Sequence, residues 1–111
     1  MRAEALRLAE GEDLLLDLPG IGAVMFLTTE RVIVARDAVQ RRPRSGVQSF
    51  PLAEIRHLRL ELASRPSGRI AVWTARGAEA VSMFFEGRAL ERAHEMIDRA
   101  RPLIARARHE A

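Results

Sequence analysis

The sequence predicts a mainly β fold (α+β by count of elements), a small barrel or sandwich of about seven antiparallel strands whose open end is covered by a C-terminal amphipathic helix. Three observations predict it. Short β-type runs separated by turn residues fill most of the 111 residues. One helix with an apolar stripe, beginning at about Arg88, follows all of them. Leu58, Leu60 and Leu62 alternate with polar residues, which is typical of a strand with one wet face. Strands followed by a single helix favour a helix laid across the sheets.

The first third of the chain predicts a lead-in segment, a strand and a hairpin. Within segment 1–10, Ala3–Ala9 are expected to form a short helix. A first strand over Asp13–Leu18 ends at the turn signal Pro19-Gly20. Two further apolar runs, Ala23–Leu27 and Arg31–Ala35, are joined closely enough to make a hairpin. Neither alternates strictly, so both are expected to be covered on two faces for part of their length.

The middle of the chain predicts an exposed loop and four more strands. The loop covers Arg36–Gly46, and an edge strand over Val47–Leu52 follows it, because Pro51 cannot donate to a central ladder. The leucine strand comes next, and Ser64–Gly68 must turn. The last two strands are expected over Arg69–Thr74 and Ala80–Phe85.

The helix presents one apolar stripe, and Pro102 is expected to kink or end it by removing the hydrogen bond to the carbonyl of Asp98. The folded domain is therefore expected over residues 11–105, with residues 106–111 as a disordered tail. The stripe consists of Leu90, Ala93, Met96, Ile97, Ala100 and Ile104.

Composition excludes several classes of function. The chain has no cysteine, which excludes disulfides, thiolate metal sites and cysteine nucleophiles. Net charge is only +3, and all basic side chains apart from the histidines are arginine. The N-terminal run is not a signal peptide, and the longest apolar run is far shorter than a membrane span. We expect a cytoplasmic protein, with peripheral attachment to the inner face of the membrane as the alternative.

The order of these segments resembles the bacterial pleckstrin-homology-like (GRAM-like) domains. The resemblance rests on the run Leu27–Val34 (sequence LTTERVIV), then Phe50-Pro51-Leu52 with Ile55 closing a corner, then the leucine strand and the final helix. It covers about Gly11 to Ala105, and it implies two near-orthogonal sheets with the helix plugging an apolar mouth. The bacterial relatives pack edge to edge into oligomers, so the resemblance implies a non-enzymatic protein-contact module. It implies no cofactor.

The best-known ligands of this fold are phosphoinositide head groups, which need basic side chains around the first two strands. Residues 18–25 contain none, so this role does not carry over. Catalysis and metal binding are not expected either, because His57, His94 and His109 lack ligand-like spacing and no nucleophile motif is present. Nucleic acid is an unlikely partner, since stacking aromatics are scarce: one Trp, four Phe and no Tyr.

The preferred interpretation is contact with a protein partner or with a second copy of the chain. If Ile70 and Val72 point inward, Trp73 points outward, either shielded by a neighbouring loop or as an interface anchor. One of the adjacent Phe84 and Phe85 must also face away from the core. The first alternative is a membrane adaptor that uses an arginine loop on anionic lipid, and the second is a small-ligand or peptide binder at the barrel opening. The candidate interaction residues are Trp73, Arg41, Arg42, Arg44, Val47 and Phe50.

Overall fold

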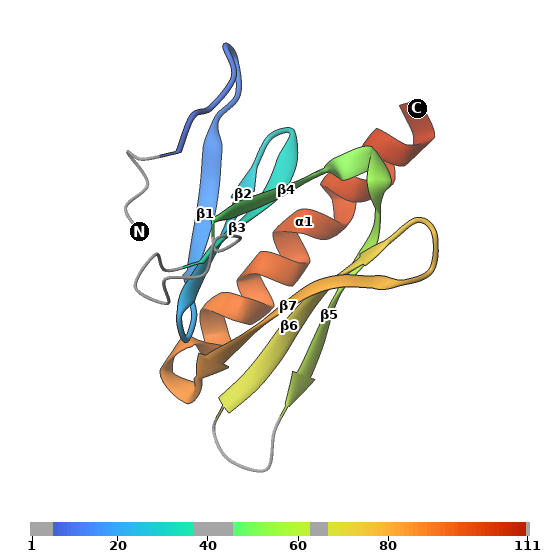
Figure 1. Ribbon diagram of the computed structural model, residues 1–111. Coiled ribbons are helices and arrows are strands. Elements are labelled where there is room, and N and C mark those ends of the chain that lie inside the picture. The colour runs from blue at the N-terminus through green and yellow to red at the C-terminus, as the bar shows by residue number, and fades with distance from the viewer. Residues whose placement is uncertain (1–5, 37–45, 63–66, 111) are drawn as a thin grey trace.

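The computed structural model describes residues 6–36, 46–62 and 67–110, and within them it contains seven strands and one long helix (Figure 1). Two short 3-10 turns, η3 and η4, precede β5 and the helix. The elements are β1 (Leu14–Pro19), β2 (Ala23–Thr28), β3 (Arg31–Arg36), β4 (Val47–Pro51), η3 (Leu52–Glu54), β5 (Ile55–Leu62), β6 (Ser67–Thr74), β7 (Glu79–Glu86), η4 (Gly87–Ala89) and α1 (Leu90–Glu110).

The strands form two antiparallel sheets, in the orders β1-β2-β3-β4 and β5-β6-β7. The predicted fold class is confirmed, although the sheets are not closed into a barrel within the described residues. A backbone hydrogen bond joins the two sheets, from the Ile21 N–H to the Phe84 carbonyl over 2.8 Å. At another corner the Leu52 N–H donates to the Glu30 carbonyl over 3.0 Å, which continues the β3–β4 pairing into η3. The resulting sandwich has an apolar interior between the sheets.

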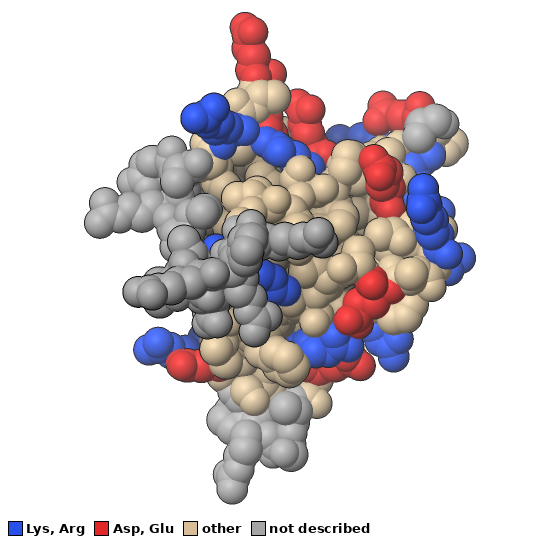
Figure 2. Space-filling model, viewed as in Figure 1, with Lys and Arg blue, Asp and Glu red and all other residues tan. Residues whose placement is uncertain are grey.

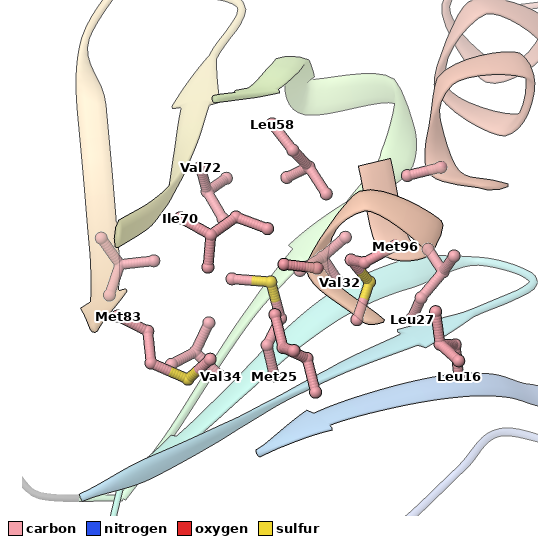
Figure 3. Packing of buried hydrophobic residues seen from close by; sticks show 14 of the residues in the cluster. Leu16, Met25, Leu27, Val32, Val34, Leu58, Ile70, Val72, Met83 and Met96 are labelled. Atoms are coloured by element: carbon pink, nitrogen blue, oxygen red, sulfur yellow. The ribbon is translucent and has the colours of Figure 1, made fainter. Parts of the chain in front are cut away.

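Side chains from both sheets and from α1 fill that interior (Figure 3). Met25 and Val34 lie opposite each other on β2 and β3, and Ile70 and Met83 do so on β6 and β7. All four are buried, and Met96 of α1 belongs to the same core cluster. Apolar side chains of both sheets and of the helix therefore form one continuous core between the sheets.

The outer face of the first sheet carries a second apolar cluster. Phe26, Ile33 and Ala35 are buried there, with Leu6 and Val24 packed against them. The hairpin strands β2 and β3 are therefore covered on both faces, as their non-alternating sequences predict. On β7 the alternation is strict: Phe85 is buried in the main core and Phe84 faces outward, 58% exposed.

Helix α1 packs on β5, η3 and β1, and its C-terminal half lies beside η3 (Figure 1). Helix α1 does not end at Pro102 but continues to Glu110, so the expectation of a disordered tail after residue 105 is wrong for residues 106–110. Ile104 is buried beyond the proline, and Leu103 and Ala107 pack on the core. Their burial outweighs the lost hydrogen bond, and Pro102 lies on the exposed side where water can reach the unpaired carbonyl.

Two further expectations need correction. The lead-in helix is not present in residues 6–9, which are the described part of that segment. The leucine strand is half-buried only at its start, since Leu58 is buried, Leu60 is partly buried and Leu62 is 63% exposed. Strand β5 extends past the end of the core, so alternation alone overestimates the burial of Leu62. The predicted loop and turn fall mostly on residues 37–45 and 63–66, outside the described residues.

Candidate functional site

The run that carries the family resemblance forms a buried polar network around Glu12. Thr28 Oγ1 donates to Glu12 Oε2 over 2.5 Å and accepts hydrogen bonds from the backbone N–H groups of Glu30 and Arg31, each over 3.0 Å. Arg31 Nε lies 2.9 Å from the same carboxylate, whose side chain is 1% exposed. Arg31 also donates to the Arg7 carbonyl over 2.8 Å. The network fixes the β2–β3 turn and ties the segment before β1 to it.

Hydrogen bonds from Arg31, Thr28 and the Ala9 N–H outweigh the effect of burial, and they lower the pKa of Glu12 from its ordinary value of 4.5 to about 2. Glu12 is therefore ionised at neutral pH, and the Glu12 hydrogen bond raises the pKa of Arg31. A fully ionised, fully paired buried carboxylate has no proton to exchange and no open face toward a ligand. The network therefore holds the β2–β3 turn in place.

The predicted interaction residues do not converge in the structure. Arg41, Arg42 and Arg44 lie outside the described residues. Val47 and Phe50 are both on β4, but they point to opposite faces: Val47 is 55% exposed opposite Ala35, whereas Phe50 packs on the main core opposite Val32. Phe50 therefore offers only part of its surface to a partner.

Trp73 points outward, as predicted, and it is shielded by side chains of the neighbouring strand. His57 lies opposite it on β5 and stacks on it, with ring centroids 5.9 Å apart and an 11° angle between the planes. The guanidinium carbon of Arg59 lies 5.7 Å from the indole centroid, a cation–π contact. The indole Nε1 is buried and has no hydrogen-bond partner among the residues that the structure describes. Phe84 is exposed on the same outer face of the sheet, opposite Arg69 and four residues along β6 from Trp73. We call the outer sheet face that carries His57, Arg59, Trp73 and Phe84 the Trp73 face.

A groove that sequence reasoning missed runs between β5 and α1. It consists of two adjoining hollows of about 400 and 460 Å³. Apolar side chains form its floor, and basic ones form its rim. The floor residues are Leu58, Ile97, Ala100 and Ile104, and the rim residues include Arg56, His57, Arg59, Arg101 and Arg108. His57 belongs to both the groove and the Trp73 face, so the two surfaces are continuous.

The rim arginines differ from others in the chain. Among the described residues, no carboxylate lies within ion-pair distance of the groove arginines, whereas Arg31, Arg69, Arg88, Arg92 and Arg99 each have an acidic partner. The seven-residue spacing of Arg101 and Arg108 places them on one side of α1, but only the tertiary structure brings them to β5. On the face shown in Figure 2, acidic and basic side chains are interspersed and form no large patch of one sign.

Within residues 6–36, 46–62 and 67–110, no group of three or more His, Asp or Glu side chains is arranged to hold a metal ion. No helix in the part of the chain that the structure describes is long and apolar enough to cross a membrane.

Comparison with known proteins rests on structure, because no protein-family model and no curated protein matches the sequence. A pleckstrin homology domain from Shewanella amazonensis SB2B superposes with a TM-score of 0.64 at 18% identity, covering 84% of this chain and 86% of that one. The chain has a pleckstrin-homology-like fold. A DUF1696 family protein with a pleckstrin-homology domain from Shewanella loihica PV-4 gives a TM-score of 0.63 at 15% identity, covering 83% of this chain and 84% of that one. At these identities the likeness of the PH-like chain to both structures concerns the fold alone.

Proposed function

We propose that this PH-like domain is a non-enzymatic module for protein–protein contact and that the Trp73 face is its contact surface. The observation that supports the proposal is the 58% exposure of Phe84 on the same sheet face as an indole already stacked with His57 and Arg59. Trp and Arg are the side chains most enriched where binding energy concentrates in protein interfaces. Burying the exposed part of Phe84 would contribute roughly 1–2 kcal/mol.

The buried Trp73 N–H adds a second argument. A buried donor without an acceptor costs about 1–3 kcal/mol, and the indole ring that carries this one contacts two exposed residues, His57 by stacking and Arg59 by its guanidinium. A partner's carbonyl that displaced either side chain would satisfy the donor. The surface is thus better suited to a partner that brings hydrogen-bond acceptors than to a purely apolar one.

The region that binds lipid head groups in other proteins of this fold offers little here. The turn between β1 and β2 has no basic residue, and the hollow beside it contains two arginines, Arg88 and Arg92. Arg88 is paired with Glu86 over 3.2 Å, and Arg92 with Asp17 over 2.6 Å. Arginines neutralised by carboxylates attract a phosphate weakly, so protein contact is favoured over head-group binding.

The first partner to test is a second copy of the chain. Light scattering measures native mass at several protein concentrations and two salt levels, for the wild type, for Phe84→Ser and for Leu62→Ser. Leu62 is the matched control, because it is 63% exposed and lies in the same sheet but outside the Trp73 face. Self-association through this face predicts a multimer that Phe84→Ser weakens about tenfold and Leu62→Ser leaves unchanged. A monomer at every concentration would remove self-assembly, and equal effects of the two substitutions would contradict the assignment of the face.

A further inference from the structure

We propose that the groove between β5 and α1 binds a small single-chain amphiphile with an anionic head, of the class of medium-chain carboxylates. The hydrocarbon tail lies in the apolar hollow of about 400 Å³, and the head lies where this hollow meets the adjoining one. The site goes beyond the proposed protein contact and does not depend on it.

The apolar hollow accounts for the tail. Its volume is at the small end of the range of pockets that hold small organic molecules. Leu58, Ala100 and Ile104 of the main core form its floor together with Ile97, which is only partly buried and presents apolar surface to the opening. Ile97 and Ile104 are seven residues apart on α1, which makes the floor about 10 Å long. One extended tail of roughly eight to ten carbons covers a floor of that length.

The junction of the two hollows accounts for the head. Arg101 and His57 line both hollows, and Arg59 lines the adjoining one of about 460 Å³. Among the described residues, neither arginine has a carboxylate within ion-pair distance. A guanidinium holds a carboxylate through two parallel hydrogen bonds. Arg101 also lies nine residues before Glu110, where α1 ends, so it is beyond the last turn in which the negative end of the helix repels an anion.

A simpler explanation is that long arginine side chains cover apolar surface with their stems and keep their charge in water. It would apply to Arg101 and Arg108 in any protein. Here, however, the stems leave the hollow open above Ile97. It also does not account for the balance of charge, since four arginines and two histidines line the two hollows against one acidic residue, Asp98. A ligand with an apolar tail and a negative head explains both observations.

The test is isothermal titration calorimetry of the full chain with decanoate, kept below the concentration at which it forms micelles. Emission of Trp73 is followed in a parallel titration. Trp73 is the single tryptophan of the chain, and it stacks on His57, which lines both hollows. Saturable binding is expected, with a change in Trp73 emission over the same concentration range. No binding at millimolar decanoate would overturn the inference, and binding that leaves Trp73 emission unchanged would overturn the position of the head.

Three further probes test the chemistry of the ligand. Octanoate should bind about tenfold more weakly than decanoate, because it buries two fewer methylene groups. Decyltrimethylammonium, with the same tail and the opposite charge, should not bind. Equal affinity of octanoate would overturn the position of the tail, and equal affinity of the ammonium compound would overturn the anionic head. Vesicles of phosphatidylglycerol that bind the chain when free decanoate does not would identify a membrane surface as the occupant and overturn the small ligand.

Variants at exposed positions locate the site. Arg101→Gln should weaken decanoate binding about tenfold, whereas Asp98→Asn, which removes a repelling carboxylate, should strengthen it about threefold. Ala105→Phe should block binding, because Ala105 lines the hollow and is exposed. Arg106→Gln is the matched control, an exposed residue of the same helix that lines neither hollow, and it should change affinity less than twofold. Equal losses for Arg101→Gln and Arg106→Gln, or weaker binding by Asp98→Asn, would overturn the assignment.

The outcome is separable from that of the proposed function, because Phe84 lines neither hollow. If decanoate fails to bind while Phe84→Ser still weakens a complex, protein contact stands and the amphiphile site fails. If decanoate binds as expected while Phe84→Ser changes no complex, the amphiphile site stands and the protein contact fails.

Discussion

The substitution Glu12→Gln tests the polar network that holds the β2–β3 turn. A glutamine keeps the shape of the side chain and removes its charge. The lowering of the Glu12 pKa from 4.5 to about 2 corresponds to about 3 kcal/mol by which the folded state prefers the ionised form, at about 1.4 kcal/mol per pKa unit. Arg31 and the Thr28 hydroxyl both lose their charged acceptor in the variant. We therefore expect Glu12→Gln to lower the free energy of unfolding at pH 7 by about 2–4 kcal/mol.

The direction of the Glu12 pKa shift determines how its contribution to the free energy of unfolding changes with pH. Because folding depresses the pKa of Glu12, its contribution is fully present above about pH 4.5 and is lost as pH falls toward 2. Urea unfolding of the wild type and of Glu12→Gln, measured at several values between pH 7 and 2, should show a stability difference that shrinks toward low pH. Other carboxylates titrate equally in both proteins, so they cancel in the difference. Glu10→Gln, at an exposed position two residues away, is the control and should change little.

Two results would refute this reasoning. A loss below about 0.5 kcal/mol at pH 7 would mean that the ion pair does not stabilise the fold beyond an ordinary surface pair. A loss that stays constant from pH 7 to 2 would mean that the effect of the substitution comes from packing and not from charge.

Three further substitutions test the fold. Gly68→Ala should lower the free energy of unfolding by about 1–3 kcal/mol, since its Cβ would lie 2.6 Å from Phe85 Cζ. The destabilisation caused by Gly68→Ala should be smaller in a Phe85→Leu background, which a double-mutant cycle measured by urea unfolding would show. Pro102→Ala should restore a helical hydrogen bond at an exposed position and raise the thermal unfolding midpoint. An unchanged midpoint would contradict the expectation that the missing hydrogen bond costs stability. Thr28→Val should cost about 1–3 kcal/mol, because it removes the hydroxyl that joins Glu12 to the turn; a neutral result in urea unfolding would contradict the structural role of the network.

The sequence predicted the fold well where local signals and burial agree. The positions of all seven strands and the helix follow from alternation, from turn residues such as Pro19-Gly20 and from the apolar stripe of the last segment. The prediction failed at Pro102, where the burial of Ile104 overrides an unfavourable local residue. It failed at Leu62 for a related reason, because alternation describes a strand and cannot show where the core beneath it ends.

The candidate site was predicted less completely. The outward direction of Trp73 and of one phenylalanine follows from strand alternation. The stacking of His57 on Trp73 depends on the register between β5 and β6, which no local pattern specifies. The groove depends on how α1 crosses β5, and the arginines that line it come from Arg56 on β5 and from Arg101 and Arg108 on α1, which are far apart in sequence. The structural role of Glu12 was missed because a charged residue before a strand is usually a solvated one.

The most direct test of the central claim, that the Trp73 face contacts protein, is site-specific photocrosslinking. A benzoylphenylalanine placed at position 84, and separately at position 62, is irradiated in the cells that naturally make the protein. Adduct mass then distinguishes a second copy from another protein. The account predicts a discrete protein adduct at position 84 and none at position 62, because the two side chains are similarly exposed but only Phe84 belongs to the Trp73 face. No adduct at position 84, or equal adducts at both positions, would contradict it.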